Sequence, residues 1–334
     1  MPTIREVATL AGVAPITASR VINDSGYASE DVRQRVKQAA EKLNYVPNVL
    51  ARSLKSKRTH TLALVITDIT NPFWTTVARG VEDAASEKDY NVIFCNTDES
   101  AQKQKAYLQT LIQKQVDGVL LVPASSDENP IEFLRQQNVQ VVLLDRSLAN
   151  TEVDVVRCDS KGGAYQLIKL LMKLGHRKIA ILRGPIGVSS AEDRMAGYQL
   201  ALQETGLETS DQLIFSGEFS VESGYQMTKK LLLMSPRPTA MFASNNFIAI
   251  GALKALRDAQ VDVPGEMSVV GFDDLPLALV VDPFLTVADQ PAYDMGRLAT
   301  QRLLEHLDGK TIQEFQETIL PVSIIERKST KAII

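Results

Sequence analysis

Residues 3–23 read "TIREVATLAGVAPITASRVIN", which predicts two short helices joined by a tight turn. Gly12 can adopt the positive φ that a turn after a helix requires. Pro15 suits the first turn of the second helix, because its missing N–H lies where no helical hydrogen bond is needed. The apolar positions at helical spacing are Ile4, Val7, Ala8 and Leu10 in the first helix and Ala18, Val21 and Ile22 in the second.

A third helix is predicted within residues 29–45, "SEDVRQRVKQAAEKLNY". Ser29 is a suitable N-cap, and Val32, Val36, Ala39 and Leu43 repeat on one face. Three short helices, the first two joined by a glycine turn, are typical of a helix-turn-helix unit, whose second helix enters the DNA major groove. The alternative is an ordinary three-helix domain whose polar residues face water.

The charge of the chain is divided unevenly along its length. Residues 1–60 contain ten Lys and Arg against five Asp and Glu, a net charge of +5, whereas the remaining residues carry −9 of the total of −4. A basic segment before an acidic body indicates that the segment meets a polyanion, although a solvated basic face without a partner is equally compatible with charge alone.

From residue 60 onward, apolar strand-like runs alternate with amphipathic helical patterns. The predicted strands of two successive groups are residues 61–67, 91–97, 118–123 and 139–145, then 178–184, 211–217, 240–244 and 268–273. A further strand, "TVADQ" at residues 286–290, is expected to return the chain to the first group, before a last helix at residues 293–309. The predicted fold class is therefore α/β, with two doubly wound parallel-sheet lobes preceded by a small all-α helix-turn-helix domain.

Several classes of protein are excluded by what the sequence lacks. With no apolar run of about 18 residues and no signal-peptide pattern at the N-terminus, a cytoplasmic location is expected. Cys95 and Cys158 lie in apolar runs and are expected to be buried and structural. His60, His176 and His306 are scattered, and no phosphate-binding loop, nucleophile elbow or metal-ligand spacing occurs. We therefore expect no enzymatic activity, no cofactor and no metal site.

Polar and aromatic side chains gather where predicted strands stop, which is where ligands bind in such sheets. Carboxylates, amides and guanidinium groups match the hydroxyls of a sugar, and flat aromatic rings match its C–H faces. The candidate effector-binding residues are Asn71, Phe73, Trp74, Asp145, Arg146, Arg194, Phe219, Asn245, Asn246, Asp273 and Gln290. Individually, an Asn or Asp here can be only a helix cap, an aromatic only core, and Arg146 only a surface ion pair.

The first 54 residues resemble the DNA-binding head and hinge of the LacI/GalR family of bacterial transcription regulators. The resemblance is carried by "VA..AGV", "T.SRV.N" and "R..V..A...L.Y.PN..AR.L". It implies a homodimer that binds double-stranded operator DNA, and the contacts that it implies are Thr3, Pro15, Ile16, Thr17, Ser19, Arg20, Asn23, Tyr27, Asn48, Leu54 and Lys57. Pro15 and Ile16 depart from the usual pattern at the base-reading pair, so the operator sequence cannot be transferred from a relative. Among these residues, Thr17 and Ser19 can donate to phosphates and Arg20 can contact a guanine.

Residues 47–59 are similar to the hinge of that family, which orders when two subunits lie side by side on DNA. In this interpretation Leu54 is the wedge that enters the minor groove and bends the duplex. A helix of about two turns is too short to be stable without DNA, so the hinge is expected to act as a switch.

The body is similar to the periplasmic ribose-binding proteins and to the ribose-type branch of the repressor family. It departs from them at Trp74, Tyr198 and Asn246, where two phenylalanines and an aspartate are usual, so a monosaccharide of pentose or hexose size is favoured over ribose itself. The implied domains are 1–46, 47–59 and 60–334, with lobe 1 at 60–157 and 289–321 and lobe 2 at 158–288 and 322–334. The function expected is a sugar-controlled repressor. The alternative is a catabolite-control-type regulator, controlled by a phosphocarrier protein, which "ERKST" near the end of the chain suggests.

Overall fold

The computed structural model describes residues 2–46, 58–149, 151–207, 210–275, 282–309 and 315–333. The chain divides into two compact units, Met1–Thr59 and His60–Ile334. The predicted hinge contacts Asn48, Leu54 and Lys57 lie outside the described residues. Their roles therefore stay predictions.

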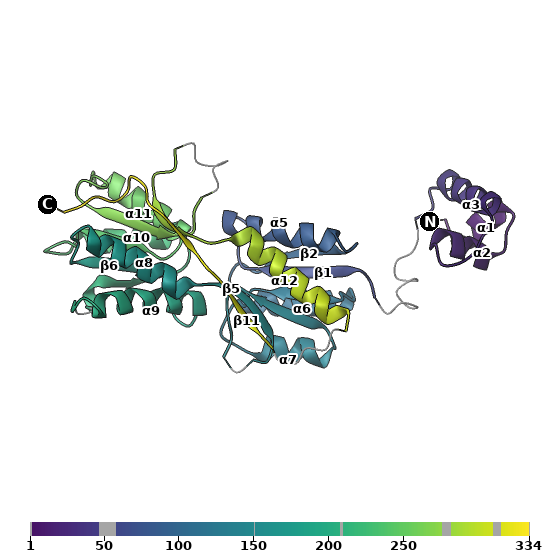
Figure 1. Cartoon of the computed structure of the whole chain (residues 1–334), viewed down its shortest axis with the longest axis horizontal. Coiled ribbons are helices and arrows are strands. Elements are labelled where there is room, and N and C mark those ends of the chain that lie inside the picture. The colour runs from purple at the N-terminus through teal and green to yellow at the C-terminus, as the bar shows by residue number, and fades with distance from the viewer. Residues whose placement is uncertain are drawn as a thin grey trace. The chain divides into compact units, whose positions relative to one another are not determined.

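Within residues 2–46, the first unit contains three helices, α1 (Ile4–Ala11), α2 (Pro15–Ile22) and α3 (Glu30–Lys42) (Figure 1). Thr3 and Glu6 form a capping box at the start of α1, and Gly12 ends this helix with φ of +66°. The predicted glycine turn and the proline at the start of α2 are thereby confirmed. Ser29 precedes α3 as predicted but makes no side-chain cap hydrogen bond.

The core of the helical unit comes from small apolar residues on all three helices. Its buried members are Val7, Ala8, Ala11, Ala18, Val21, Val36 and Ala39. Leu10, which was predicted to share the apolar face of α1, is 46% exposed and does not belong to this core. The reason is geometric, because Val7, Ala8 and Ala11 already occupy the inward stripe of a two-turn helix.

The first lobe of the second unit is built on a sheet with the strand order β11-β5-β4-β3-β1-β2. Its strand pairs are all parallel. The strands are β1 (Thr61–Ile66), β2 (Asn91–Asn96), β3 (Gly118–Leu121), β4 (Gln140–Leu144), β5 (Asp154–Cys158) and β11 (Glu317–Leu320). One face is covered by α5 (Pro72–Ser86) and α12 (Ala292–Leu307), and the other by α6 (Ala101–Gln113) and α7 (Asn129–Gln136).

Helices α5 and α12 pack side by side on the first sheet (Figure 1). Their backbones approach so closely that a Cβ added at Gly80 would lie 2.1 Å from the carbonyl oxygen of Tyr293. Glycine is required there because any side chain would push the two helices apart.

The second lobe repeats this arrangement with the strand order β12-β10-β9-β8-β6-β7. Its strands are β6 (Ile179–Arg183), β7 (Ile214–Ser216), β8 (Ala240–Ala243), β9 (Ser268–Phe272), β10 (Thr286–Asp289) and β12 (Ser323–Ile325). All pairs are parallel except that of β12 with β10. Helices α8 (Ser160–Lys173) and α9 (Ser189–Gln203) cover one face, and α10 (Val221–Leu232) and α11 (Asn246–Asp258) cover the other. The 3-10 turn η1 (Asp211–Leu213) precedes β7. The predicted fold class is confirmed.

The chain passes between the two sheets three times, and two predicted boundaries need correction. Strand β10 was expected in the first lobe, but it pairs with β9 and β12, so Asp289 belongs to the second sheet. Cys158, assigned to the second lobe, pairs with Leu320 in the first sheet. Apolar alternation alone cannot tell which of two similar sheets a strand joins, because both offer a buried slot.

The two cysteines are free and buried, as predicted. Burial raises the pKa of both thiols above the ordinary value. Among the described residues, no helix combines the length and apolar character needed to span a bilayer.

Candidate functional site

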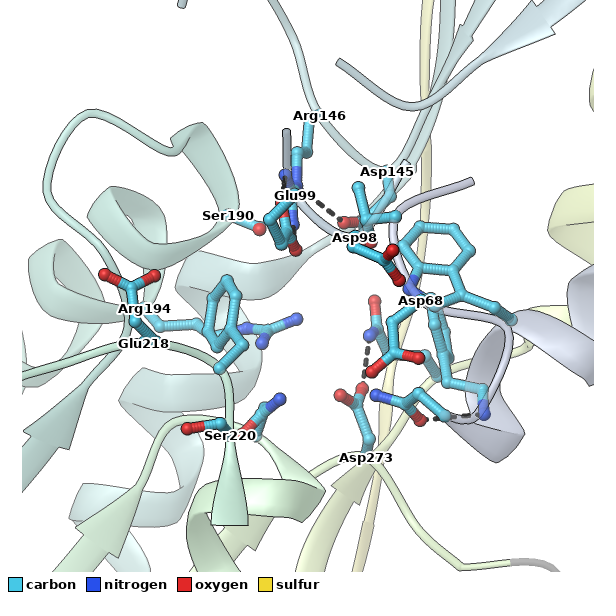
Figure 2. A pocket seen from close by; sticks show the side chains of 17 residues that line it. Asp68, Asp98, Glu99, Asp145, Arg146, Ser190, Arg194, Glu218, Ser220 and Asp273 are labelled. Carbon is cyan, nitrogen blue, oxygen red and sulfur yellow. Dashed lines mark hydrogen bonds and ion pairs between the residues drawn. The ribbon is translucent and has the colours of Figure 1, made fainter. Parts of the chain in front are cut away.

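A cavity of about 280 Å³ lies between the two lobes of the second unit, near the lower limit for small-molecule sites (Figure 2). Most of its residues follow the carboxyl ends of strands. It is lined by Thr67, Asp68, Asn71, Phe73, Trp74, Asp98, Glu99, Asp145, Arg146, Ser190, Arg194, Glu218, Phe219, Ser220, Asn245, Asp273 and Gln290. Ten of the eleven candidate effector residues are therefore on the wall of one cavity, although contact with an effector stays a prediction.

Asn246 is the candidate that does not line the cavity. Its amide donates to Asn71 Oδ1 at 2.9 Å and accepts from Asn71 Nδ2 at 3.1 Å, which joins the start of α11 to the start of α5. Both side chains are buried. Asn246 is thus a lobe-to-lobe contact beside the site, and Asn245 next to it caps α11 through Ile248 N while still facing the cavity.

On the first-lobe wall, Asp145 and Arg146 follow β4. Asp145 has φ of +61°, an unusual backbone conformation for a non-glycine residue. Nη1 and Nη2 of Arg146 each donate to one carboxylate oxygen of Glu99 at a distance of 2.6 Å. Nη1 also donates to the carbonyl oxygen of Pro123 at 2.9 Å. Burial acts to lower the pKa of Arg146, but the hydrogen bonds and charge of Glu99 outweigh it and the pKa is raised.

On the second-lobe wall, Arg194 does not lie at a strand end, contrary to the prediction, but in the second turn of α9. Its guanidinium group donates to the carbonyl oxygen of Ser244 at 2.7 Å and to Ser160 Oγ at 3.3 Å. It also stacks 3.9 Å from the ring centre of Phe272. Arg194 was thus correctly predicted to line the cavity but wrongly placed at a strand end, since it lies on the helix that follows β6.

Burial raises the pKa of two carboxyl groups that line the cavity. Burial raises the pKa of Asp273 to about 6, against the opposing effects of Arg194 and of a hydrogen bond from Gln290. Burial likewise raises the pKa of Asp145, and Arg194 and Arg146 oppose that rise. Like Asp145, Asp273 has a positive φ, of +68°. Each lobe thus presents one aspartate from the same unusual backbone turn.

Aromatic rings form the apolar part of the cavity. Phe73 and Trp74 begin α5, and their rings meet edge to face with centres 4.8 Å apart. Across the cavity, Phe219 lies over Gly184, where an added Cβ would be 2.2 Å from the ring. Phe73 and Trp74 also belong to the core of the first lobe, so the functional and structural interpretations of these residues both hold.

Seven lining residues were not predicted from the sequence. They are Thr67, Asp68, Asp98, Glu99, Ser190, Glu218 and Ser220. Thr67 and Asp68 directly follow β1, and Asp98 and Glu99 closely follow β2. The rule that found Asp145 would have found these four as well, had it been applied to every strand.

In the helical unit, the predicted DNA-contact residues with described positions lie mostly on exposed faces. Ile16 is 63% exposed and Tyr27 is 91% exposed, large fractions for apolar and aromatic side chains. Pro15, Arg20 and Asn23 are exposed, while Thr17 and Ser19 are half-buried. Asn23 donates to the hydroxyl and carbonyl oxygens of Ser19, and Thr3 caps α1.

Comparison with known families matches both units of the chain. Residues 3–48 match the model of bacterial regulatory proteins of the lacI family, and residues 59–328 match that of periplasmic binding proteins and the sugar binding domain of the LacI family. This chain belongs to the LacI family. Its helical unit is therefore a helix-turn-helix DNA-binding domain, and the protein is a transcriptional regulator.

Individual relatives of this LacI-family chain agree over nearly its whole length. It is 38% identical over 331 residues to a ribose operon repressor of Halalkalibacterium halodurans, covering 99% of this chain and 98% of that one. The structure of the lac repressor dimer bound to operator and the anti-inducer ONPF has 27% identity and a TM-score of 0.87, covering 99% of each chain. A LacI family regulator from Enterococcus faecium with bound ribose has 29% identity and a TM-score of 0.74, covering 82% of this chain and 100% of that one.

One departure from the family pattern has a structural explanation. The hydroxyl of Tyr198, where the ribose-type branch has phenylalanine, donates to the carbonyl oxygen of Ile179 at 2.8 Å in the second core. Tyr198 is fully buried and does not line the cavity. Of Trp74, Tyr198 and Asn246, only Trp74 lines the cavity.

Proposed function

We propose that this LacI-family regulator is a repressor whose operator affinity is controlled by a monosaccharide bound between the lobes. The observation that carries the proposal is the mixed chemistry of the cavity. Its wall combines aromatic rings with buried Arg and Asp side chains, a combination suited to the C–H faces and the hydroxyls of a sugar.

The geometry suggests a role for each group. Phe73, Trp74 and Phe219 offer apolar surface to the faces of a sugar ring. Arg146 and Arg194 donate hydrogen bonds, and the Asp145 and Asp273 carboxylates accept them. The hydroxyl group is both donor and acceptor, so it can satisfy both kinds of partner within one ring.

Control of DNA binding follows from the position of the cavity between two lobes. A ligand that contacts both walls favours their closed arrangement. In a homodimer, a shift of the first lobe against its partner would change whether the two hinges can order on the operator. Such coupling between two sites is typically worth about 1–3 kcal/mol.

The catabolite-control alternative was suggested by "ERKST", residues 326–330. Two side chains of this segment are used within the second lobe. Arg327 pairs with Asp274 through both guanidinium nitrogens, and the fully buried Ser329 donates to the carbonyl oxygen of Val269 at 2.6 Å. Because the motif anchors the end of the chain, it lends less support to a protein-docking function, and the sugar-controlled repressor is favoured.

The test combines ligand and DNA binding. Thermal unfolding of the full chain is measured against a panel of pentoses and hexoses, since a ligand at 100 times its Kd stabilises by about 2.7 kcal/mol. Any sugar that stabilises the protein is then added to an operator-binding measurement by fluorescence anisotropy. The proposal fails if no sugar raises the Tm, or if a sugar that does so leaves operator affinity unchanged.

A further inference from the structure

The positive charge on the first-lobe wall of the cavity is cancelled by a carboxylate from a neighbouring loop. Arg146 is 4% exposed, and Glu99 meets it with both carboxylate oxygens at 2.6 Å. Such a two-point pair is the strongest common arrangement of these groups. A ligand approaching this wall therefore meets a neutral pair instead of a free cation.

The pair still leaves hydrogen-bonding capacity on Arg146. Of the five N–H donors of Arg146, two are used by Glu99 and one by the carbonyl oxygen of Pro123. Its Nε is buried and has no hydrogen-bond partner among the described residues; the nearest carboxylate oxygen, Asp145 Oδ2, is 3.9 Å away. Nη2 uses one of its two N–H groups in these bonds, so the other remains a potential donor.

The backbone fixes Glu99 in this position. Both Asp98 and Glu99 have positive φ, of +50° and +56°, directly after the loop that leaves β2. Two consecutive non-glycine residues in this conformation are unusual and carry backbone strain. The Glu99 N–H also donates to the carbonyl oxygen of Thr67 at 3.3 Å, which ties the turn to the end of β1. The fold therefore fixes the backbone position from which the Glu99 side chain reaches Arg146.

The rest of the cavity reinforces this charge pattern. Six of its lining residues are acidic and only two are basic, Arg146 and Arg194. Lys103, which does not line the cavity, pairs with Asp98. If Asp145 and Asp273 are protonated and Lys103 cancels the charge of Asp98, three lining carboxylates remain. They are Asp68, Glu99 and Glu218, and they still outnumber the two guanidinium groups. An anionic ligand would therefore enter a cavity in which carboxylates outnumber the cations, at a large desolvation cost.

We propose that Glu99 is a specificity-determining residue that restricts the effector to uncharged sugars by neutralising Arg146. The inference rests on the proposed function and narrows its ligand class. Phosphorylated sugars and sugar acids are rejected at this wall because the charge of Arg146 is already compensated by Glu99. Glu99 also positions Arg146 through this two-point pair.

The experiment compares matched ligand pairs on the full chain by isothermal titration at about pH 8, where a phosphate monoester carries close to two charges. The probes are D-ribose, D-glucose and D-fructose, each beside its terminal phosphate ester. We expect one or more neutral sugars to bind and their esters to bind about 100-fold more weakly or not at all. Glu99→Gln keeps the shape of the side chain but removes its charge. In this variant the ratio of neutral-sugar affinity to phosphate-ester affinity should fall by about 10-fold or more, whereas the neutral-sugar affinity itself should fall only a few-fold.

Two further variants separate specificity from folding. Glu99→Asp keeps the charge and should keep the rejection of phosphate esters. Glu87→Gln is the matched control, because Glu87 makes a similar two-point pair with Arg297, at 2.8 and 3.2 Å, on the outer side of the first lobe. It should leave both ligand series unchanged. Loss of neutral-sugar binding in Glu99→Asp as well as in Glu99→Gln would show a purely structural residue and overturn the proposal.

The remaining outcomes are distinct. An unmodified protein that binds a phosphate ester as tightly as its parent sugar overturns the inference but leaves the sugar-controlled repressor intact. Unchanged discrimination in Glu99→Gln overturns the assignment to Glu99. If neither series binds the unmodified protein, the proposed function fails, and the inference fails with it.

Discussion

The two walls of the cavity share an unusual backbone conformation at an aspartate but differ in how the charge of their arginine is compensated. Asp145 in the first lobe and Asp273 in the second both take a positive φ beside an arginine of the cavity. On the first wall, Arg146 is matched by a carboxylate that is itself partly in water, since the Glu99 side chain is 30% exposed. On the second wall, Arg194 meets a carbonyl, a hydroxyl and the ring of Phe272, none of which is charged.

This difference assigns different roles to two similar residues. Arg194 is the cation that most strongly opposes the rise in the pKa of both Asp145 and Asp273. Arg146 is already compensated before any ligand arrives. Arg194 should therefore govern the charge balance of the whole cavity, whereas Arg146 should act as a fixed donor.

The largest expected effect is that of Arg194→Met. Removing this cation leaves Asp145 and Asp273 buried without their main counter-charge, so the free energy of unfolding at neutral pH should fall by about 3–5 kcal/mol. Urea titration measures this loss, with Arg79→Met, at an exposed i,i+4 pair with Asp83, as the control. A loss no greater than that of the control would break the comparison.

Asp273→Asn tests the buried carboxylate through its pH dependence. Because the pKa of about 6 in the folded state exceeds the ordinary 3.8, protonated Asp273 stabilises the fold below about pH 4, and this contribution is lost as the pH rises through 6. The asparagine of the variant stays uncharged at every pH, so this contribution is not lost. The free energy of unfolding of the variant at pH 7 should therefore exceed that of the parent by up to roughly 3 kcal/mol.

The measurement is urea titration of both proteins between pH 4 and pH 7. Asp258→Asn, at an exposed position near the end of α11, controls for the substitution itself. Parallel stability curves for Asp273→Asn and the parent would show that Asp273 does not titrate as inferred.

Arg146→Met should have a smaller effect than Arg194→Met. Its carboxylate partner Glu99 is partly exposed and can be solvated once the pair is broken, so we expect a loss of about 1–2 kcal/mol. If urea titration gives this order, it supports the different roles assigned to the two arginines. If Arg146→Met is the more destabilising variant, the assignment is wrong.

The smallest expected effect concerns the Asn71–Asn246 contact between the lobes. A double-mutant cycle with Asn71→Ala and Asn246→Ala should give a coupling energy of about 0.5–1.5 kcal/mol, the usual contribution of buried hydrogen bonds. The cycle cancels the separate cost of losing the Asn71 cap on α5. Strict additivity in thermal or urea unfolding would show that this contact does not help to hold the lobes together.

Much of this architecture could be predicted because each element carries a local signal. Strand β1 is a continuous apolar run, and the turn between α1 and α2 contains a glycine with positive φ. Cavity-lining residues such as Asp145 and Gln290 follow strands directly, so the periodicity that locates a strand also locates the cavity.

The parts that could not be predicted depend on contacts between distant segments. The partner of Arg146 is 47 residues away in sequence, and Asn71 and Asn246 are 175 residues apart. Arg194 was predicted at the end of a strand, but it lies on α9, and local periodicity does not show how that helix packs. The prediction that Leu10 is buried was wrong for a related reason, since a two-turn helix buries only a narrow stripe of its surface.

The last strands of the chain have a consequence for its synthesis. Strand β11 forms an outer edge of the first sheet and β12 an outer edge of the second, although only Pro321 and Val322 separate them. Neither lobe can complete its sheet until the ribosome has released this segment, so the two lobes mature together and not one after the other. A premature stop codon before Glu317 would expose two unpaired strand edges at once, and such edges recruit other chains. We therefore expect a truncated product to aggregate or be degraded, so that it would not persist as a half-functional regulator.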